Sequence, residues 1–277
     1  MKNIIFFFAA VMLVASCSSS DNNPDPNPSG PPNPPSPPSV EAKVLPSKVV
    51  METEKNGVVT YTISYVSDTQ KINKITITGT DRNNEERYIY KGDLIDKIEY
   101  GSNGDFVQYE YENSMLVREI AYRQNQQNDK TEYKYLTNQS VEKKQYERKD
   151  GAWVLSGEML FNFDSNGNLV KGEADFGSEG NVELTATYDN KSTSVVNIEG
   201  WTQIHFTGGI PLGDNIDFVD IVGRRNNPVQ ISAVTHEGDI DIAYTYEFKD
   251  EKKPKFPTKA IGKLNNQILF TAEISYQ

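Results

Sequence analysis

The sequence predicts an all-β domain: an antiparallel meander of repeated hairpins forming a curved or rolled sheet, with a β-sandwich as the alternative. Two observations predict this class. Apolar and polar residues alternate with period two along much of the chain, and pairs of aromatic residues recur at near-regular intervals. No amphipathic helical pattern of three turns follows Val40. Period-two alternation with β-branched and aromatic residues is typical of half-buried strands.

The alternation is clearest between residues 59 and 65. Val59, Tyr61, Ile63 and Tyr65 alternate there with threonine and serine, and Ile72, Ile75 and Ile77 follow among polar neighbours. Side chains two residues apart point to the same face of a strand. These residues are therefore expected to contribute to a core on one face of the sheet.

An aromatic pair opens each hairpin repeat. The pairs are Tyr88 and Tyr90, Tyr109 and Tyr111, Tyr133 and Tyr135, and Phe161 and Phe163, with starts 21 to 28 residues apart. Each pair precedes a turn rich in Gly, Asn or Asp, residues that tolerate positive φ. In the first unit Leu94, Ile98 and Tyr100 share one parity, so we expect them on one apolar face. Repeats of this length usually stack into a continuous core.

The segment Phe161-Asn162-Phe163-Asp164-Ser165-Asn166-Gly167-Asn168-Leu169 resembles the YD repeats of RHS-type proteins. That family shows aromatic-x-aromatic-Asp, a Gly-containing turn and then Leu. The other units lack the Asp or the Gly. The closer resemblance is to Bacteroidota lipoproteins of unknown function with degenerate YD-like hairpins, which end in a similar way to Tyr244–Phe248, Phe256–Lys259 and Ile268–Tyr276. This resemblance implies an antiparallel β-meander and supplies no activity.

The N-terminus has the pattern of a secretory signal. Lys2 precedes an apolar run over residues 4–14, which is too short to cross a bilayer, since a span needs roughly 20 residues. The string Leu13-Val14-Ala15-Ser16-Cys17 resembles the lipobox of bacterial lipoproteins. The resemblance implies cleavage before Cys17 and a diacylglycerol thioether on its sulfur. The membrane is thus an expected partner, through the N-terminal lipid.

Composition divides the chain into three parts. Residues 1–16 are the expected signal peptide, 17–39 a lipidated cysteine with a Pro-rich tether, and 40–277 a single β-domain. Nine of the fourteen prolines lie between Pro24 and Pro38, which favours an extended polyproline II tether. In Bacteroidota lipoproteins, acidic residues after the cysteine favour export to the outer face of the outer membrane, and Asp21 fits that pattern. We therefore expect a surface-exposed, lipid-anchored protein.

Charge and cysteine usage exclude several functions. Without Lys2, 27 basic residues face 39 acidic ones, a net charge of −12 that disfavours nucleic acid as a partner. Cys17 is the only cysteine, so internal disulfides and thiolate metal sites are excluded. No cofactor is expected.

Catalytic motifs are missing from the sequence. The two histidines form no known catalytic pattern, and there is no Gly-x-Ser-x-Gly or P-loop. His236-Glu237-Gly238-Asp239 and Asp164-x-Asn166-x-Asn168 are interpreted as turns rather than metal sites. We expect no enzyme activity, with a carboxylate-based hydrolase as the weaker alternative.

The least repetitive stretch, residues 200–227, is the candidate ligand site. Its candidate residues are Trp201, His205, Phe206, Arg224 and Arg225. Irregular insertions among regular hairpins often carry binding residues. The alternative is that the tryptophans, Trp153 and Trp201, are core residues. The expected function is a non-catalytic binding module for a glycan, peptide or envelope protein. A structural component, whose edge strands pair with a partner by β-augmentation, is the other hypothesis.

Overall fold

The computed structural model describes residues 44–80, 83–137, 139–175, 180–205, 216–218, 222–236 and 238–277. The expected signal peptide, Cys17 and the Pro-rich tether lie outside these residues. Lipidation and the three-part division of the chain therefore remain predictions.

Sixteen strands make up the sheet within the described residues. They are β1 (Pro46–Thr53), β2 (Gly57–Tyr65), β3 (Ile72–Gly79), β4 (Asn83–Lys91), β5 (Leu94–Tyr100), β6 (Asp105–Glu112), β7 (Met115–Arg123), β8 (Gln126–Thr137), β9 (Ser140–Lys149), β10 (Ala152–Phe163), β11 (Leu169–Asp175), β12 (Asn181–Ser192), β13 (Asn226–Thr235), β14 (Gly238–Glu247), β15 (Lys259–Leu264) and β16 (Gln267–Tyr276). One short helix, α1 (Trp201–Ile204), lies between β12 and β13.

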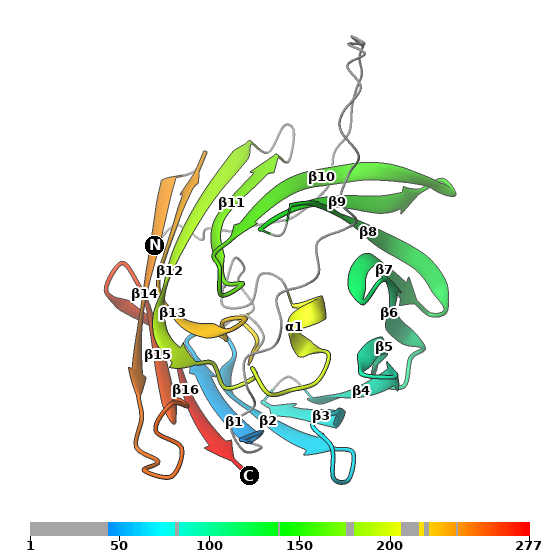
Figure 1. Cartoon of the computed structure of the whole chain (residues 1–277). Coiled ribbons are helices and arrows are strands. Elements are labelled where there is room, and N and C mark those ends of the chain that lie inside the picture. Colours follow the sequence, from blue (N-terminus) through cyan, green and yellow to red (C-terminus); the bar gives the residue numbers. More distant parts are fainter. Residues whose placement is uncertain are drawn as a thin grey trace.

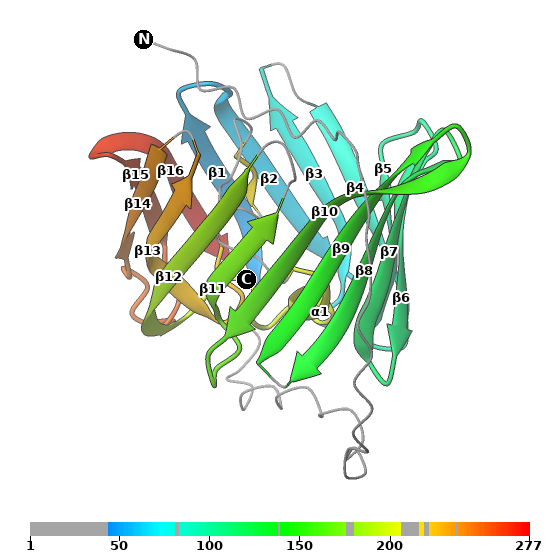
Figure 2. The ribbon, with the colours of Figure 1, turned by 90° about the horizontal axis from the view of Figure 1, so that it is seen from above.

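Each strand pairs antiparallel with the next, and β1 pairs with β16, so the sheet closes into a barrel (Figures 1 and 2). The antiparallel meander is confirmed. The rolled sheet and the sandwich are replaced by a closed barrel, because closure depends on pairing the two ends of the domain, for example Val49 with Ile274. A closed barrel has no edge strands. The described sheet therefore offers no edge for the β-augmentation that we expected of a structural component.

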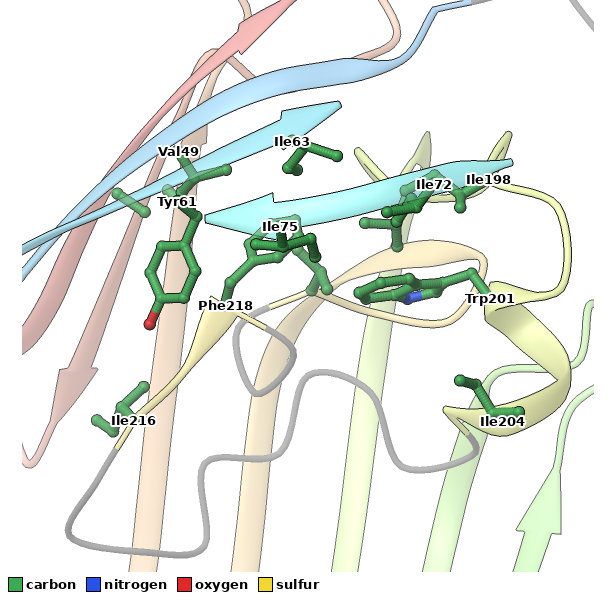
Figure 3. Close-up of a cluster of buried hydrophobic side chains, with 14 of the residues drawn as sticks. Val49, Tyr61, Ile63, Ile72, Ile75, Ile198, Trp201, Ile204, Ile216 and Phe218 are labelled. Atoms are coloured by element: carbon green, nitrogen blue, oxygen red, sulfur yellow. The ribbon is translucent and has the colours of Figure 1, made fainter. Parts of the chain in front are cut away.

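The apolar face of the alternating strands forms the inner surface of the barrel. Val49, Tyr61 and Ile77 are cross-strand partners, which lie on one face of a sheet, and all three are buried. Figure 3 shows Val49 and Tyr61 on the side of the wall that meets the internal side chains. The period-two pattern thus predicted the core face of these strands correctly.

The outer face of the wall carries ion pairs between neighbouring strands. Examples are Lys74–Glu85 at 2.9 Å, Arg118–Glu110 at 2.7 Å and Lys144–Glu158 at 2.7 Å. The same outer face also carries exposed apolar side chains, such as Val58, Ile89 and Val234. No helix among the described residues has the length and apolar character to cross a bilayer.

The aromatic repeat has a different role at each of its two positions. The first residue of a pair is an inward core side chain, as for Tyr88, Tyr109 and Tyr133. A tyrosine near the end of several even-numbered strands donates its hydroxyl to a backbone carbonyl near the start of the preceding odd-numbered strand. Tyr111 and Tyr246 are second residues of an aromatic pair, whereas Tyr65, Tyr188 and Tyr276 follow an aliphatic residue at that spacing. These hydroxyl-to-carbonyl bonds are Tyr65 to Pro46 (2.7 Å), Tyr111 to Ile95 (2.7 Å), Tyr188 to Leu169 (2.8 Å), Tyr246 to Pro228 (2.9 Å) and Tyr276 to Pro257 (2.6 Å). We call them the tyrosine latches, because each ties together the open end of one hairpin.

One detail of the predicted repeat is wrong. Leu94 was expected to share a face with Ile98, but Ile95 is the fully buried residue and Leu94 is partly exposed. The cause is an irregularity in the β4–β5 ladder between Ile89 and Tyr90. A bulge of this kind adds one residue to a strand and reverses the facing of every residue before it.

Candidate ligand site inside the barrel

The β12–β13 connection enters the barrel and fills part of it, with α1 inside the ring of strands (Figure 1). We call its described residues, 193–205, 216–218 and 222–225, the plug. Trp201 and Phe218 are each 1% exposed, and their ring centroids are 6.0 Å apart. Tyr61 of β2 packs against Phe218 and donates a hydrogen bond to Asp217 Oδ1 at 2.9 Å (Figure 3). The plug thus completes the core of the strands around it.

The plug fits its surroundings closely at its glycine turn. Gly200, which precedes α1, has a φ of +78°. A Cβ at this position would lie 2.8 Å from Ile95 Cγ1 of the wall. Only glycine meets both the conformation and the spacing here.

Four of the five predicted site residues lie in the plug, and two of them, Trp201 and His205, are in contact. Trp201 is enclosed by the core and stacks on Tyr88 with ring centroids 6.5 Å apart. His205 packs against Trp201 at 4.2 Å, and its Nε2 has no hydrogen-bond partner among the described residues. Burial lowers the pKa of His205 to about 4. Phe206 lies outside the described residues.

Arg224 ties the plug to the wall. Its Nε donates to Thr202 O at 2.9 Å and its Nη1 to Gly167 O at 3.1 Å, and its guanidinium lies 5.3 Å from the centre of the Phe163 ring. Burial lowers the pKa of Arg224 to about 10. Arg225 has a buried Nε without a hydrogen-bond partner in the described part of the chain. These contacts give Trp201 and Arg224 packing roles, and ligand binding by the five residues remains a prediction.

The interior is not filled evenly. Inward side chains next to the plug are buried, and we call this side the filled half: Val49, Met51, Ile75, Ile77, Phe270 and Ala272. Beyond a buried layer of Tyr109, Tyr133 and Phe161, inward positions of β6–β10 are partly exposed, and we call this side the accessible half: Val107, Glu119, Ala121, Asp129, Thr131, Lys143, Gln145, Glu147 and Met159. An inward side chain with exposed surface means that water reaches the interior at that point.

Charged side chains face inward in the accessible half. Glu119 lies opposite Tyr109 and Thr131 in the ladders and accepts a hydrogen bond from Tyr133 Oη at 2.9 Å. Burial raises the pKa of Glu119. Lys143 lies opposite Tyr133 and Met159. Burial lowers the pKa of Lys143, and the charge of Glu119 acts in the opposite direction.

Sequence reasoning missed this cluster for two reasons. A bulge in the ladder between Glu110 and Tyr111 places both Leu116 and Glu119 inward, although strict alternation puts them on opposite faces. Lys143 does share parity with buried Val141, and that was a usable signal. However, adjacent lysines are usually interpreted as solvated surface.

The turn interpretation of the Asp164 segment is confirmed. Asp164 Oδ1 accepts hydrogen bonds from the backbone nitrogens of Asn166 at 2.9 Å and Asn168 at 2.8 Å. His236 lies in the turn between β13 and β14, and Glu237 lies outside the described residues. No group of three or more metal-ligating side chains is found among the described residues.

No family model matches the chain, and no curated protein matches it. Several solved structures are similar to it, among them two porin-like proteins. A porin-like protein from Bacteroides vulgatus ATCC 8482 aligns with a TM-score of 0.55 and 15% identity, over 85% of this chain and 99% of that one. A porin-like protein from Bacteroides uniformis ATCC 8492 aligns with a TM-score of 0.51 and 14% identity, over 84% of this chain and 96% of that one. At these identities the likeness shows the all-β barrel fold alone.

Proposed function

We propose that this chain is a lipid-anchored, non-catalytic binding protein of the outer membrane that takes its ligand in the accessible half of the barrel. One observation carries the proposal: inward side chains of β6–β10 have exposed surface although the wall is closed. Ligand sites are typically concave and largely apolar, with a few placed polar groups. The inward set combines three apolar side chains, Val107, Ala121 and Met159, with polar and charged ones that include Glu119 and Lys143.

The enclosed position limits the size of the ligand. Of the partners expected from the sequence, a glycan or a short peptide can enter a barrel, whereas a folded envelope protein contributes at most an extended segment. Two of the inward carboxylates accept a tyrosine hydroxyl: Glu119 from Tyr133 at 2.9 Å and Glu86 from Tyr88 at 3.1 Å.

The lipid anchor is testable apart from ligand binding. The lipobox resemblance puts the anchor at Cys17, and the charged outer face supports a barrel held beside the membrane rather than within it. We expect Cys17→Ser to move the protein from the membrane fraction to the soluble fraction. We also expect residues 18–277, which contain all sixteen strands, to remain in solution without detergent. A requirement for detergent would contradict this arrangement.

The position of the ligand site is tested by filling the accessible half. Ala121 faces inward and Ile120 faces outward on the same strand, so Ala121→Trp blocks the interior and Ile120→Trp is its matched control. The mature chain is first screened by thermal shift against glycans, peptides and amphiphiles. A ligand at a hundred times its Kd adds about 2.7 kcal/mol to the free energy of unfolding, enough to move the Tm by several degrees.

We expect one ligand class to raise the Tm of the native chain and of Ile120→Trp, but not of Ala121→Trp. Equal shifts in all three proteins would place the ligand outside the barrel. Both variants are compared without ligand first, so that a change in fold is recognised before binding is measured.

A further inference from the structure

Two consecutive lysines of β9 face opposite sides of the wall. Lys144 points outward and its Nζ lies 2.7 Å from Glu158 Oε1. Lys143 points inward, between Tyr133 and Met159 in the ladders. Among the described residues, Lys143 has no hydrogen-bond or ion-pair partner, whereas outward lysines such as Lys74 and Lys97 pair with glutamates. An ammonium group carries three donors, and enclosing a charge without an acceptor is costly.

Glu119 does not supply that acceptor. Its Oε1 accepts the Tyr133 hydroxyl, and no ion pair within 4.0 Å joins it to Lys143 in the described part of the structure. The two side chains are close enough for the charge of Glu119 to affect the pKa of Lys143. Burial raises the pKa of Glu119, while the charge of Lys143 and the hydrogen bond from Tyr133 lower it. The ammonium of Lys143 therefore has coordination positions open toward the interior.

Several apolar groups lie around Lys143, beside the polar Thr131 and Gln145. Its cross-strand neighbour Met159 is partly exposed, as is Ala174, which lies opposite Met159 on β11. Gly157, an inward position of β10 next to Gln145, has no side chain to fill the space. Val107 and Ala121 add apolar surface on β6 and β7. Such a surface contacts hydrocarbon better than it contacts a small hydrated ion.

We infer that the accessible half binds an anionic amphiphile. Its carboxylate or phosphate group accepts hydrogen bonds from Lys143, and its apolar part lies against Met159 and Ala121. This inference rests on the proposed function and narrows the ligand to one chemical class. Charge-assisted hydrogen bonds are about twice as strong as neutral ones, so Lys143 contributes much of the discrimination between anionic and neutral ligands.

The test compares four probes on residues 18–277 by isothermal titration calorimetry below the critical micelle concentration. Decanoate and decyl phosphate carry both parts of the ligand, decanol lacks the charge, and inorganic phosphate lacks the apolar part. Lys143→Met removes the charge, Lys143→Arg retains it, and Lys144→Met is the matched outward control. Thermal unfolding of each variant establishes that the barrel is folded.

We expect decanoate and decyl phosphate to bind at least about tenfold more tightly than decanol or phosphate. Lys143→Met should remove that difference, and Lys143→Arg and Lys144→Met should keep it. Unchanged decanoate binding in folded Lys143→Met would overturn the inference, as would equal binding of decanol and decanoate. If Ala121→Trp then still blocked both probes, the interior site would stand without its anion preference. If Ala121→Trp left binding intact, the interior site itself would fall.

Discussion

The filled and accessible halves are built from the same hairpin repeat, yet they are stabilised differently. In the filled half the inward face of the wall packs on the plug, and residues such as Met51 and Phe270 are fully buried. In the accessible half the corresponding inward positions of β6–β10 retain exposed surface. The hairpin repeat therefore determines how the strands of the wall pair. The filling of the interior depends instead on the long connection between β12 and β13.

The outer face of the accessible half carries a row of cation–π contacts. Lys97 lies 5.1 Å from the centre of the Phe106 ring, which stacks on Tyr122 with centroids 4.2 Å apart. Farther along, Lys130 lies 4.2 Å from the Tyr146 ring centre, and Arg148 lies 5.4 Å from that of Trp153. Exposed cation–π contacts contribute about 0.5–1 kcal/mol each. These contacts lie on the outer face of strands whose inward residues Tyr109, Tyr133 and Phe161 belong to the core.

Substitution of the two tryptophans is expected to give the largest difference in stability between the two halves. Trp201 lies in the plug and Trp153 on the outer face of the accessible half. We expect Trp201→Ala to lower the free energy of unfolding by about 3–5 kcal/mol, because it leaves a cavity in a closed core. Trp153→Ala should cost about 1 kcal/mol, the size of a cation–π contact. Denaturant unfolding measures both values, and equal costs would show that the halves are not packed differently.

The pH dependence of stability tests the plug through His205. Burial lowers its folded pKa to about 4, below the ordinary 6.5. As pH falls below 6.5, the unfolded chain binds a proton that the folded chain does not. The folded state therefore loses stability between pH 6.5 and 4, by an amount that approaches about 3 kcal/mol and levels off below pH 4. The measurement is Tm against pH for the native chain and for His205→Phe, which retains a ring against Trp201.

Carboxylates titrate in the same pH range, so the informative quantity is the difference between the native chain and the variant. We expect His205→Phe to flatten the pH profile. Parallel profiles for the native chain and His205→Phe would contradict a buried, neutral histidine.

The strands of the wall could be predicted from the sequence, whereas the segments and side chains inside the barrel could not, for physical reasons. Alternation is a local property, so buried Tyr61 and Tyr109 were assigned to the core face. Bulges shift the alternation by one residue. For this reason Ile95, and not the expected Leu94, faces the core, and the inward position of Glu119 was not predicted. Closure and the plug depend on contacts between distant segments. Trp201 has no periodic pattern around it, and its burial comes from Tyr88 of the wall together with His205 and Phe218 of the plug.

The smallest predicted effect concerns the tyrosine latches, which occur in both halves. Tyr111 bonds Ile95 O at 2.7 Å beside the accessible half, and Tyr246 bonds Pro228 O at 2.9 Å in the filled half. Tyr→Phe removes one hydroxyl and leaves a carbonyl unpaired, which costs about 1 kcal/mol. If a latch acts only within its own hairpin, Tyr111→Phe and Tyr246→Phe should cost the same within about 0.5 kcal/mol in urea unfolding, and their effects should add. A clearly larger cost for Tyr111→Phe would mean that the latches compensate for missing core on the accessible side. The repeat would then be adapted to the unfilled interior rather than indifferent to it.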